Sequence, residues 1–211
     1  MTAKKYSKKK ASANFKKYHT SNPVVRRLIS NFMQHITTIV NNLTPGSIID
    51  LGCGEGQTAR ALYEKNGDIN YHGIDINNEA VRKASAANLP ACFQFSRGDI
   101  LNITPEKKAD MVICLEVLEH LPHPQAAVDK ISSTAREYAV ISVPWEPFFQ
   151  IGSLLRGKYI KNLGNHPEHI QHFNKKKLTG MLQKEFSTVS IKTSFPWLIA
   201  VCKKQKNEFS A

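Results

Sequence analysis

Residues 48–56 read Ile-Ile-Asp-Leu-Gly-Cys-Gly-Glu-Gly, an apolar run followed by three glycines at alternate positions. Glycine lets the backbone turn sharply, and it lets a ligand approach the main chain without an intervening Cβ. A helix is expected to begin directly afterwards, at Gln57. The stretch therefore predicts a strand, a tight turn and a helix that together bind a nucleotide-like ligand.

The turn departs from a dinucleotide-binding fingerprint in two ways. Such a fingerprint has its third glycine one position later, where Gln57 stands, and it rests a pyrophosphate on the helix N-terminus. The acids Asp50 and Glu55 would repel that pyrophosphate, whereas they suit a ligand that carries an ammonium group and no phosphate. An NAD-dependent dehydrogenase is disfavoured for these reasons.

A further acid stands where a ribose would be bound. The next strand candidate, 71–75, ends in Asp75, which follows Gly52 by 23 positions. In nucleotide-binding α/β folds a carboxylate about 20 residues beyond the first glycine accepts hydrogen bonds from the ribose hydroxyls. The spacing thus predicts a ligand with a ribose.

Strand and helix patterns alternate along the chain. Asn22 followed by Pro23 predicts a helix start, and apolar residues at helical spacing extend that helix over 24–42. The predicted strands are 47–51, 71–75, 92–96, 109–115, 137–143, 187–194 and 197–202, and the helices predicted between the first five are 57–65, 78–87 and 124–134. The pattern predicts an α/β fold, a Rossmann-like doubly wound and mostly parallel sheet with helices on both faces.

In these motifs the chain, over residues 22–202, resembles the class I S-adenosylmethionine-dependent methyltransferases. The resemblance implies seven strands, one of them antiparallel, and S-adenosylmethionine as methyl donor with S-adenosylhomocysteine as product. It implies that the glycine turn wraps the methionine part of the donor, that Asp75 binds the ribose and that Asp99 lies beside the adenine. The cofactor-binding residues expected on this basis are Asp50, Gly52, Cys53, Gly54, Gly56, Asp75, Ile76, Asp99, Ile100 and Leu115.

A second constellation, Glu-Val-Leu-Glu-His at 116–120, follows the fourth strand. If these residues form a helical turn, Glu116, Glu119 and His120 stand on one side of it. Here the chain resembles ubiquinone-pathway O-methyltransferases and small-RNA 2′-O-methyltransferases, which hold a metal with such a set and one further histidine, for which His169 fits best. Three interpretations stay open: a divalent metal site, a metal-free site in which His120 is the catalytic base, and a structural role in which His120 is a satisfied histidine at a helix end.

Composition fits a single domain of 211 residues, 41% of them apolar. We expect one methyltransferase domain over 14–211, with a lid-like insertion at about 144–173 that is rich in aromatic and basic residues. Residues 1–13 are polar and rich in lysine, so we expect a disordered basic head. Of the net charge of +12, nine positive charges precede Asp50, a stretch without any acid. Such a head either stays solvated or contacts nucleic acid or anionic lipid.

No apolar run is long enough to span a membrane, and the first residues lack the apolar stretch of a signal peptide. The four cysteines are widely spaced and predict no disulfide framework. We therefore expect a cytoplasmic enzyme. The leading hypothesis is methyl transfer to an oxygen or nitrogen atom of a small-molecule acceptor by in-line displacement. The alternatives are an RNA-modifying methyltransferase with the metal site, and a non-catalytic RNA-binding protein on the same fold.

Overall fold

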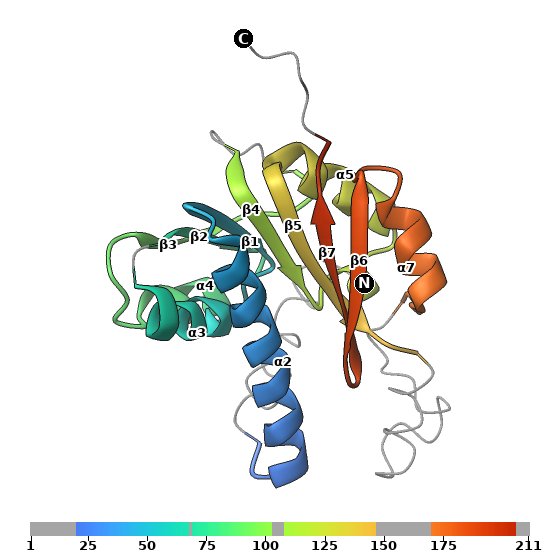
Figure 1. The fold of residues 1–211 in the computed structure, drawn as a ribbon. Helices are drawn as coiled ribbons and strands as arrows, with labels where there is room; N and C mark the ends of the chain where they lie inside the picture. Colours follow the sequence, from blue (N-terminus) through green and yellow to red (C-terminus); the bar gives the residue numbers. More distant parts are fainter. Residues whose placement is uncertain (1–19, 68, 103–107, 147–169, 206–211) are drawn as a thin grey trace.

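The computed structural model describes residues 20–67, 69–102, 108–146 and 170–205 (Figure 1). The strands are β1 (Ser47–Leu51), β2 (Asn70–Asp75), β3 (Phe93–Arg97), β4 (Ala109–Leu115), β5 (Ala135–Pro144), β6 (Thr188–Ser194) and β7 (Trp197–Lys203). The helices are α2 (Pro23–Leu43), α3 (Gln57–Asn66), α4 (Asn78–Ser85), α5 (Pro124–Thr134) and α7 (Lys175–Leu182), with a 3-10 turn, η1 (Leu118–His120). The predicted head, 1–13, and residues 147–169 of the predicted insertion lie outside the described residues.

All seven strands form one sheet in the order β3-β2-β1-β4-β5-β7-β6. The strands β1 to β5 pair in parallel, whereas β7 runs antiparallel between β5 and β6. The predicted doubly wound sheet with one antiparallel strand is confirmed. The strand order reverses direction between β1 and β4, and open α/β sheets bind their ligands outside the carboxyl ends of the strands at such a point.

Helix α2, the first helix that the structure describes, has a clear start signal and a clear stop signal. The side chain of Asn22 accepts hydrogen bonds from the backbone N–H groups of Val24 and Val25, and Pro23 occupies the first turn. At the other end Thr44 adopts a left-handed conformation, and its N–H donates to the carbonyl of Val40. This helix is two residues longer than predicted, with one residue added at each end.

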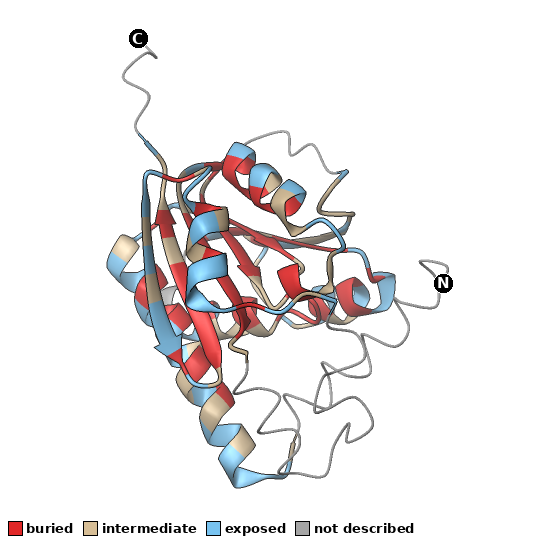
Figure 2. Ribbon diagram, turned by 90° about the vertical axis from the view of Figure 1, so that its right-hand side faces the viewer, coloured by how far each residue is buried: buried red, intermediate tan, exposed pale blue. Residues whose placement is uncertain are grey.

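Each face of the sheet has its own apolar core. The helices α2 and α3 contribute buried side chains such as Ile36 and Leu62 to the core on one face. The helices α5 and α7 contribute Ile131 and Leu178, among others, to the core on the other. Figure 2 shows the buried residues concentrated on the strands and on the helix sides that face them. The site at the strand ends is therefore carried by a sheet that is held on both faces.

In the part of the chain that the structure describes, no helix is both long enough and apolar enough to cross a membrane.

Removal of the Ile36 side chain is expected to destabilise the protein strongly, because this residue is fully buried on the side of α2 that faces the sheet. We expect Ile36→Ala to lower the free energy of unfolding by about 2–5 kcal/mol. The control Gln34→Ala changes an exposed position on the same helix, and we expect an effect within about 0.5 kcal/mol. Urea denaturation measures both; equal midpoints for the two variants would contradict the assigned face of the helix.

Candidate functional site

The predicted donor-binding residues meet at the carboxyl edge of the sheet. Asp50 lies in β1, Asp75 ends β2, Asp99 follows β3 and Leu115 ends β4. The exit of β3 is tied to that of β2, because Gly98 N–H donates to the carbonyl of Asp75 at 3.1 Å. The structure thus brings the predicted set together at the point where the strand order reverses.

The turn after β1 requires glycine. Gly52, Gly54 and Gly56 have φ angles of 84°, 56° and 77°, in the left-handed region that side chains disfavour. The N–H groups of Gly52 and Cys53 both point at the carbonyl of Ile74, at 2.7 and 3.2 Å. The turn is therefore hydrogen-bonded to the end of β2, and it lies at the carboxyl edge of the sheet.

Asp75 holds this turn in place. Its Oδ2 accepts a hydrogen bond from Gly54 N–H at 2.9 Å, and its Oδ1 accepts one from Asn77 N–H at 2.8 Å. The residue is only 4% exposed. Each carboxylate oxygen has a second lone pair, so Asp75 retains the capacity to accept hydrogen bonds from a diol while it ties the loop to β2.

Beside Asp75 the chain exposes an apolar surface. Ile76 is 40% exposed, although the carboxylate before it is buried. On the other side Asp99 accepts hydrogen bonds from Leu101 N–H and from the side-chain amide of Asn102, both at 3.0 Å, and so stabilises the turn after β3. Ile100 packs against the core. Ile76 therefore offers the open apolar contact of this set.

Three buried and titratable groups, those of Asp50, Cys53 and Tyr71, lie in or beneath the glycine turn. The hydroxyl of Tyr71 donates a hydrogen bond to Oδ2 of Asp50. Burial raises the pKa of Asp50 to about 7; the Tyr71 hydrogen bond opposes this rise and the charge of Asp75 adds to it. Burial, with the charges of Asp50 and Asp75, also raises the pKa of the Cys53 thiol. Cys53 thus stays protonated, whereas Asp50 changes its charge near neutral pH.

Glu55 is directed at α4. Its Oε1 lies 3.0 Å from Nζ of Lys83, which also approaches Glu79 at 3.7 Å. The expectation that Glu55 repels a phosphate therefore weakens, because a lysine offsets its charge. Of Asp50 and Glu55, the two acids expected to repel a pyrophosphate, only Asp50 lies beneath the turn.

Glu116 is held by the two strands that follow β4 in the sheet. Its backbone has a φ of 59°, which is uncommon for a residue other than glycine. Oε1 accepts a hydrogen bond from Ser142 Oγ at 3.2 Å, and Oε2 accepts one from Trp197 Nε1 at 2.6 Å. The Trp197 ring packs against Phe32 of α2, with 4.9 Å between ring centroids. The carboxylate of Glu116 is thus oriented by β5 and β7.

The helical turn in the Glu-Val-Leu-Glu-His stretch is shorter than 116–120, since η1 covers Leu118–His120. Glu119 is buried, with Oε1 at 3.8 Å from Nε2 of His120. Within the described ranges, no three His, Cys, Asp or Glu side chains are grouped so that they could hold a metal ion. His169, the fourth predicted ligand, lies outside these ranges. The metal site stays a prediction.

Residues 24–185 match the model of a protein family described as a methyltransferase domain. The chain belongs to this family. The match covers most of the described sheet, including the glycine turn and Asp75. The predicted class I S-adenosylmethionine-dependent methyltransferase family is confirmed, and S-adenosylmethionine is the donor that this class uses.

Curated relatives are similar over part of their length. The chain is 28% identical over 124 residues to a ubiquinone biosynthesis O-methyltransferase of Nitrosomonas europaea, covering 56% of this chain and 48% of the relative. It is 30% identical over 145 residues to the enzyme of that name from Colwellia psychrerythraea, covering 62% and 55%. The chain spans about half the length of these relatives.

Solved structures of methyltransferases share the fold. Magnesium protoporphyrin IX methyltransferase of Synechocystis, with bound SAH, has a TM-score of 0.72 at 18% identity, and the match covers 97% of this chain and 100% of that one. The plantazolicin methyltransferase BpumL has a TM-score of 0.74 at 18% identity, with coverage of 96% and 92%. At these identities the likeness concerns the fold.

Sequence reasoning missed several residues that shape the site. Asn77 caps α4 and donates its N–H to Asp75, and an Asn just before a helical pattern is a recognisable capping signal. Tyr71 shares a strand face with Gly73 by simple alternation, and Asp50, its hydrogen-bond partner, lies opposite Gly73 on β1. Trp197 and Ser142 carry no local signal, because their contacts with Glu116 depend on the order of the strands.

Substitution of Gly52 is expected to damage both the fold and the donor site. A Cβ there would lie 2.4 Å from Cγ2 of Val117, in addition to the backbone strain. Gly67 also has a positive φ, but a Cβ there meets nothing within 4 Å. We expect Gly67→Ala to cost about 1–3 kcal/mol of stability from strain alone, and Gly52→Ala to cost clearly more and to abolish donor binding.

Thermal unfolding and calorimetric titration with S-adenosylhomocysteine measure the two effects. A Gly52→Ala protein that is as stable as Gly67→Ala and binds the ligand normally would contradict the close packing of the turn.

Proposed function

We propose that the protein transfers the methyl group of S-adenosylmethionine to an oxygen or nitrogen atom of a small-molecule acceptor. The observation that carries the proposal is the Asp75 carboxylate, clamped between Gly54 and Asn77 at the carboxyl end of β2 in a chain of the methyltransferase family. The names of the curated relatives, which are O-methyltransferases, favour an oxygen acceptor.

The donor lies along the carboxyl edge in this proposal. Its methionine part occupies the glycine turn, residues 52–56, its ribose hydroxyls donate to Asp75, and its adenine covers Ile76 and approaches Asp99 and Ile100. The exposed apolar surface of Ile76 supports the adenine position, since a planar ring that covers it removes apolar surface from water. Leu115, partly buried at the end of β4, lies on the acceptor side of the donor.

The chemical step needs little from the protein beyond position. The sulfonium of the donor activates the methyl group, so the enzyme must align an acceptor atom with it and exclude water. Alignment alone contributes on the order of 7–11 kcal/mol. An acceptor hydroxyl also needs a base, and we assign that role to His120, whose side chain is 12% exposed at the end of η1. The neighbouring Glu119 would stabilise the protonated imidazole.

We assign no metal ion a role in the methyl transfer. In the family branch that the Glu-Val-Leu-Glu-His stretch resembles, Glu116 would be a ligand. Here both oxygens of Glu116 accept hydrogen bonds, from Ser142 and Trp197, and its backbone turns it toward β5 and β7. We therefore assign no ligand role to Glu116 in this proposal, and the metal site stays a prediction.

Loss of the Asp75 carboxylate is expected to abolish tight donor binding. Each charged hydrogen bond to a ribose hydroxyl contributes about 1.5–3 kcal/mol, so we expect Asp75→Ala to weaken S-adenosylmethionine binding by at least roughly 100-fold. The control Glu79→Ala removes a half-exposed carboxylate on α4, two residues beyond Asn77, and should bind normally. Calorimetric titration measures both proteins, with circular dichroism to verify folding.

Unchanged affinity in folded Asp75→Ala would refute the ribose assignment. The reaction itself is tested by following S-adenosylhomocysteine formation with a panel of phenolic and amine acceptors. Absence of donor binding by the unmodified protein would overturn the proposed function.

A further inference from the structure

Tyr71 and Asp50 form a buried polar pair beneath the glycine turn. Tyr71, Gly73 and Asp75 alternate along β2 and so share one face of the sheet. In the register of the two strands, Asp50 lies opposite Gly73. The Tyr71 hydroxyl donates to Asp50 Oδ2, with Tyr71 only 1% and Asp50 2% exposed. No part of the methyl-transfer proposal uses this tyrosine.

The ring of Tyr71 is fixed by its neighbours. It stacks on Phe93, with centroids 5.4 Å apart, and tilts against Phe95 at 5.9 Å. The absence of a side chain at Gly73 makes this packing possible, because a Cβ there would lie 2.7 Å from Phe95 and 2.9 Å from Cys53 Sγ. The direction of the Tyr71 hydroxyl is therefore set by the aromatic packing.

The charges around Asp50 come from β2 and from the glycine turn. Asp75 on β2 raises the pKa of Asp50, whereas Tyr71 lowers it by its hydrogen bond. In the turn, Cys53 is a protonated thiol, and Glu55 pairs with Lys83 of α4. The elements α2, α3 and β4 contribute apolar side chains to the core that contains Tyr71, among them Ile36, Val40, Ala59, Leu62, Met111 and Ile113, and the buried polar residues that the structure describes in α2 and α3 are the uncharged Thr37 and Thr58.

We propose that Tyr71 is a positioning residue for the donor: its hydroxyl, fixed by the aromatic packing, holds the carboxyl group of Asp50 beneath the glycine turn, where Asp50 supplies the counter-charge for the ammonium group of the donor. The inference rests on the proposed function, since it presumes that the donor lies in the glycine turn. At neutral pH the carboxyl group of Asp50 is partly protonated. Binding of the donor's ammonium group beside it therefore releases this proton to the solvent.

The pair gives donor binding a defined pH dependence. Because burial raises the pKa of Asp50 to about 7, the protonated form dominates below that pH, and donor affinity falls as the pH drops through it. Removal of the Tyr71 hydroxyl takes away a group that lowers this pKa. We expect Tyr71→Phe to move the midpoint of the affinity profile upward by about one pH unit.

The test is calorimetric titration with S-adenosylhomocysteine between about pH 5.5 and 8.5, for the unmodified protein, Tyr71→Phe and Asp50→Asn. We expect Tyr71→Phe to bind roughly fivefold more weakly at pH 7 and to recover nearly full affinity at pH 8.5. Asp50→Asn should bind weakly throughout. The ammonium group of the ligand titrates identically in every titration, so differences between the proteins report on Asp50.

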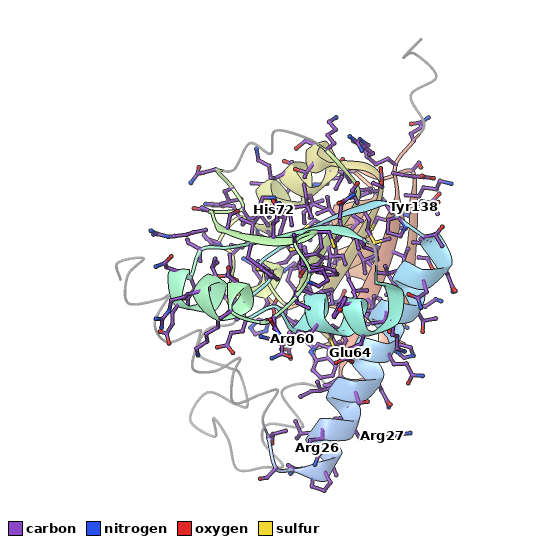
Figure 3. All side chains as sticks on the ribbon, turned by 90° about the vertical axis from the view of Figure 1, so that its left-hand side faces the viewer. Arg26, Arg27, Arg60, Glu64, His72 and Tyr138 are labelled. Atoms are coloured by element: carbon purple, nitrogen blue, oxygen red, sulfur yellow. The ribbon has the colours of Figure 1, made fainter. Side chains whose placement is uncertain are left out.

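Tyr138→Phe is the matched control, because it removes a hydroxyl from another tyrosine, one that is partly buried. The ring of Tyr138 contacts Lys203, whose Nζ lies 5.5 Å from the ring centroid. In Figure 3 Tyr138 lies well apart from His72, the neighbour of Tyr71 on β2. Its affinity profile should superimpose on that of the unmodified protein. A purely structural role of Tyr71 would weaken binding equally at all pH values, so the recovery at high pH is the decisive readout.

A second measurement applies even if Tyr71→Phe does not fold. Titration of the unmodified protein near pH 7, in two buffers of different ionisation enthalpy, should show release of roughly half a proton per ligand bound beyond that of Asp50→Asn. Absence of this release, or a Tyr71→Phe profile that matches the unmodified one, overturns the role of Tyr71. Failure of the unmodified protein to bind at any pH instead overturns the proposed function.

Discussion

The attachment of the glycine turn to the end of β2 is the constraint on which the site depends. Asp75 accepts hydrogen bonds from the turn and from the start of α4, while the carbonyl of Ile74 accepts two more from the turn. A turn with three positive φ angles has no repeating hydrogen-bond pattern of its own. These contacts from β2 therefore determine its shape, and they fix the position of the carboxylate that we propose binds the ribose.

Much of the fold was predictable because its signals are local. The start and end of β1 at Ser47 and Leu51 were predicted, since a Pro-Gly pair precedes the strand and the first glycine of the turn follows it. The start of β5 was placed two residues too late, at 137. The reason is that α5 ends at Thr134 and the strand begins at Ala135 without an intervening loop, an arrangement that no composition change marks.

The site was predictable where a motif places residues along one segment, and it was not where contacts cross between segments. The glycine turn and the strand-ending Asp75 could be located from spacing alone. The partners of Glu55, 28 residues away in Lys83, and of Asp50, 21 residues away in Tyr71, depend on which strands and helices become neighbours. From the sequence alone, Asp50 and Glu55 were therefore expected to repel a phosphate. In the folded chain Lys83 partly offsets this repulsion by pairing with Glu55.

The contact between Trp197 and Glu116 joins residues that are 81 positions apart in the chain. During synthesis, Glu116 leaves the ribosome well before β7 does, and domains form as units once their sequence is available. The left-handed backbone at Glu116 therefore has no indole to hold it until the antiparallel strand inserts between β5 and β6. The final orientation of the Glu116 carboxylate thus waits for the last strand of the sheet, whereas the glycine turn depends only on segments made earlier.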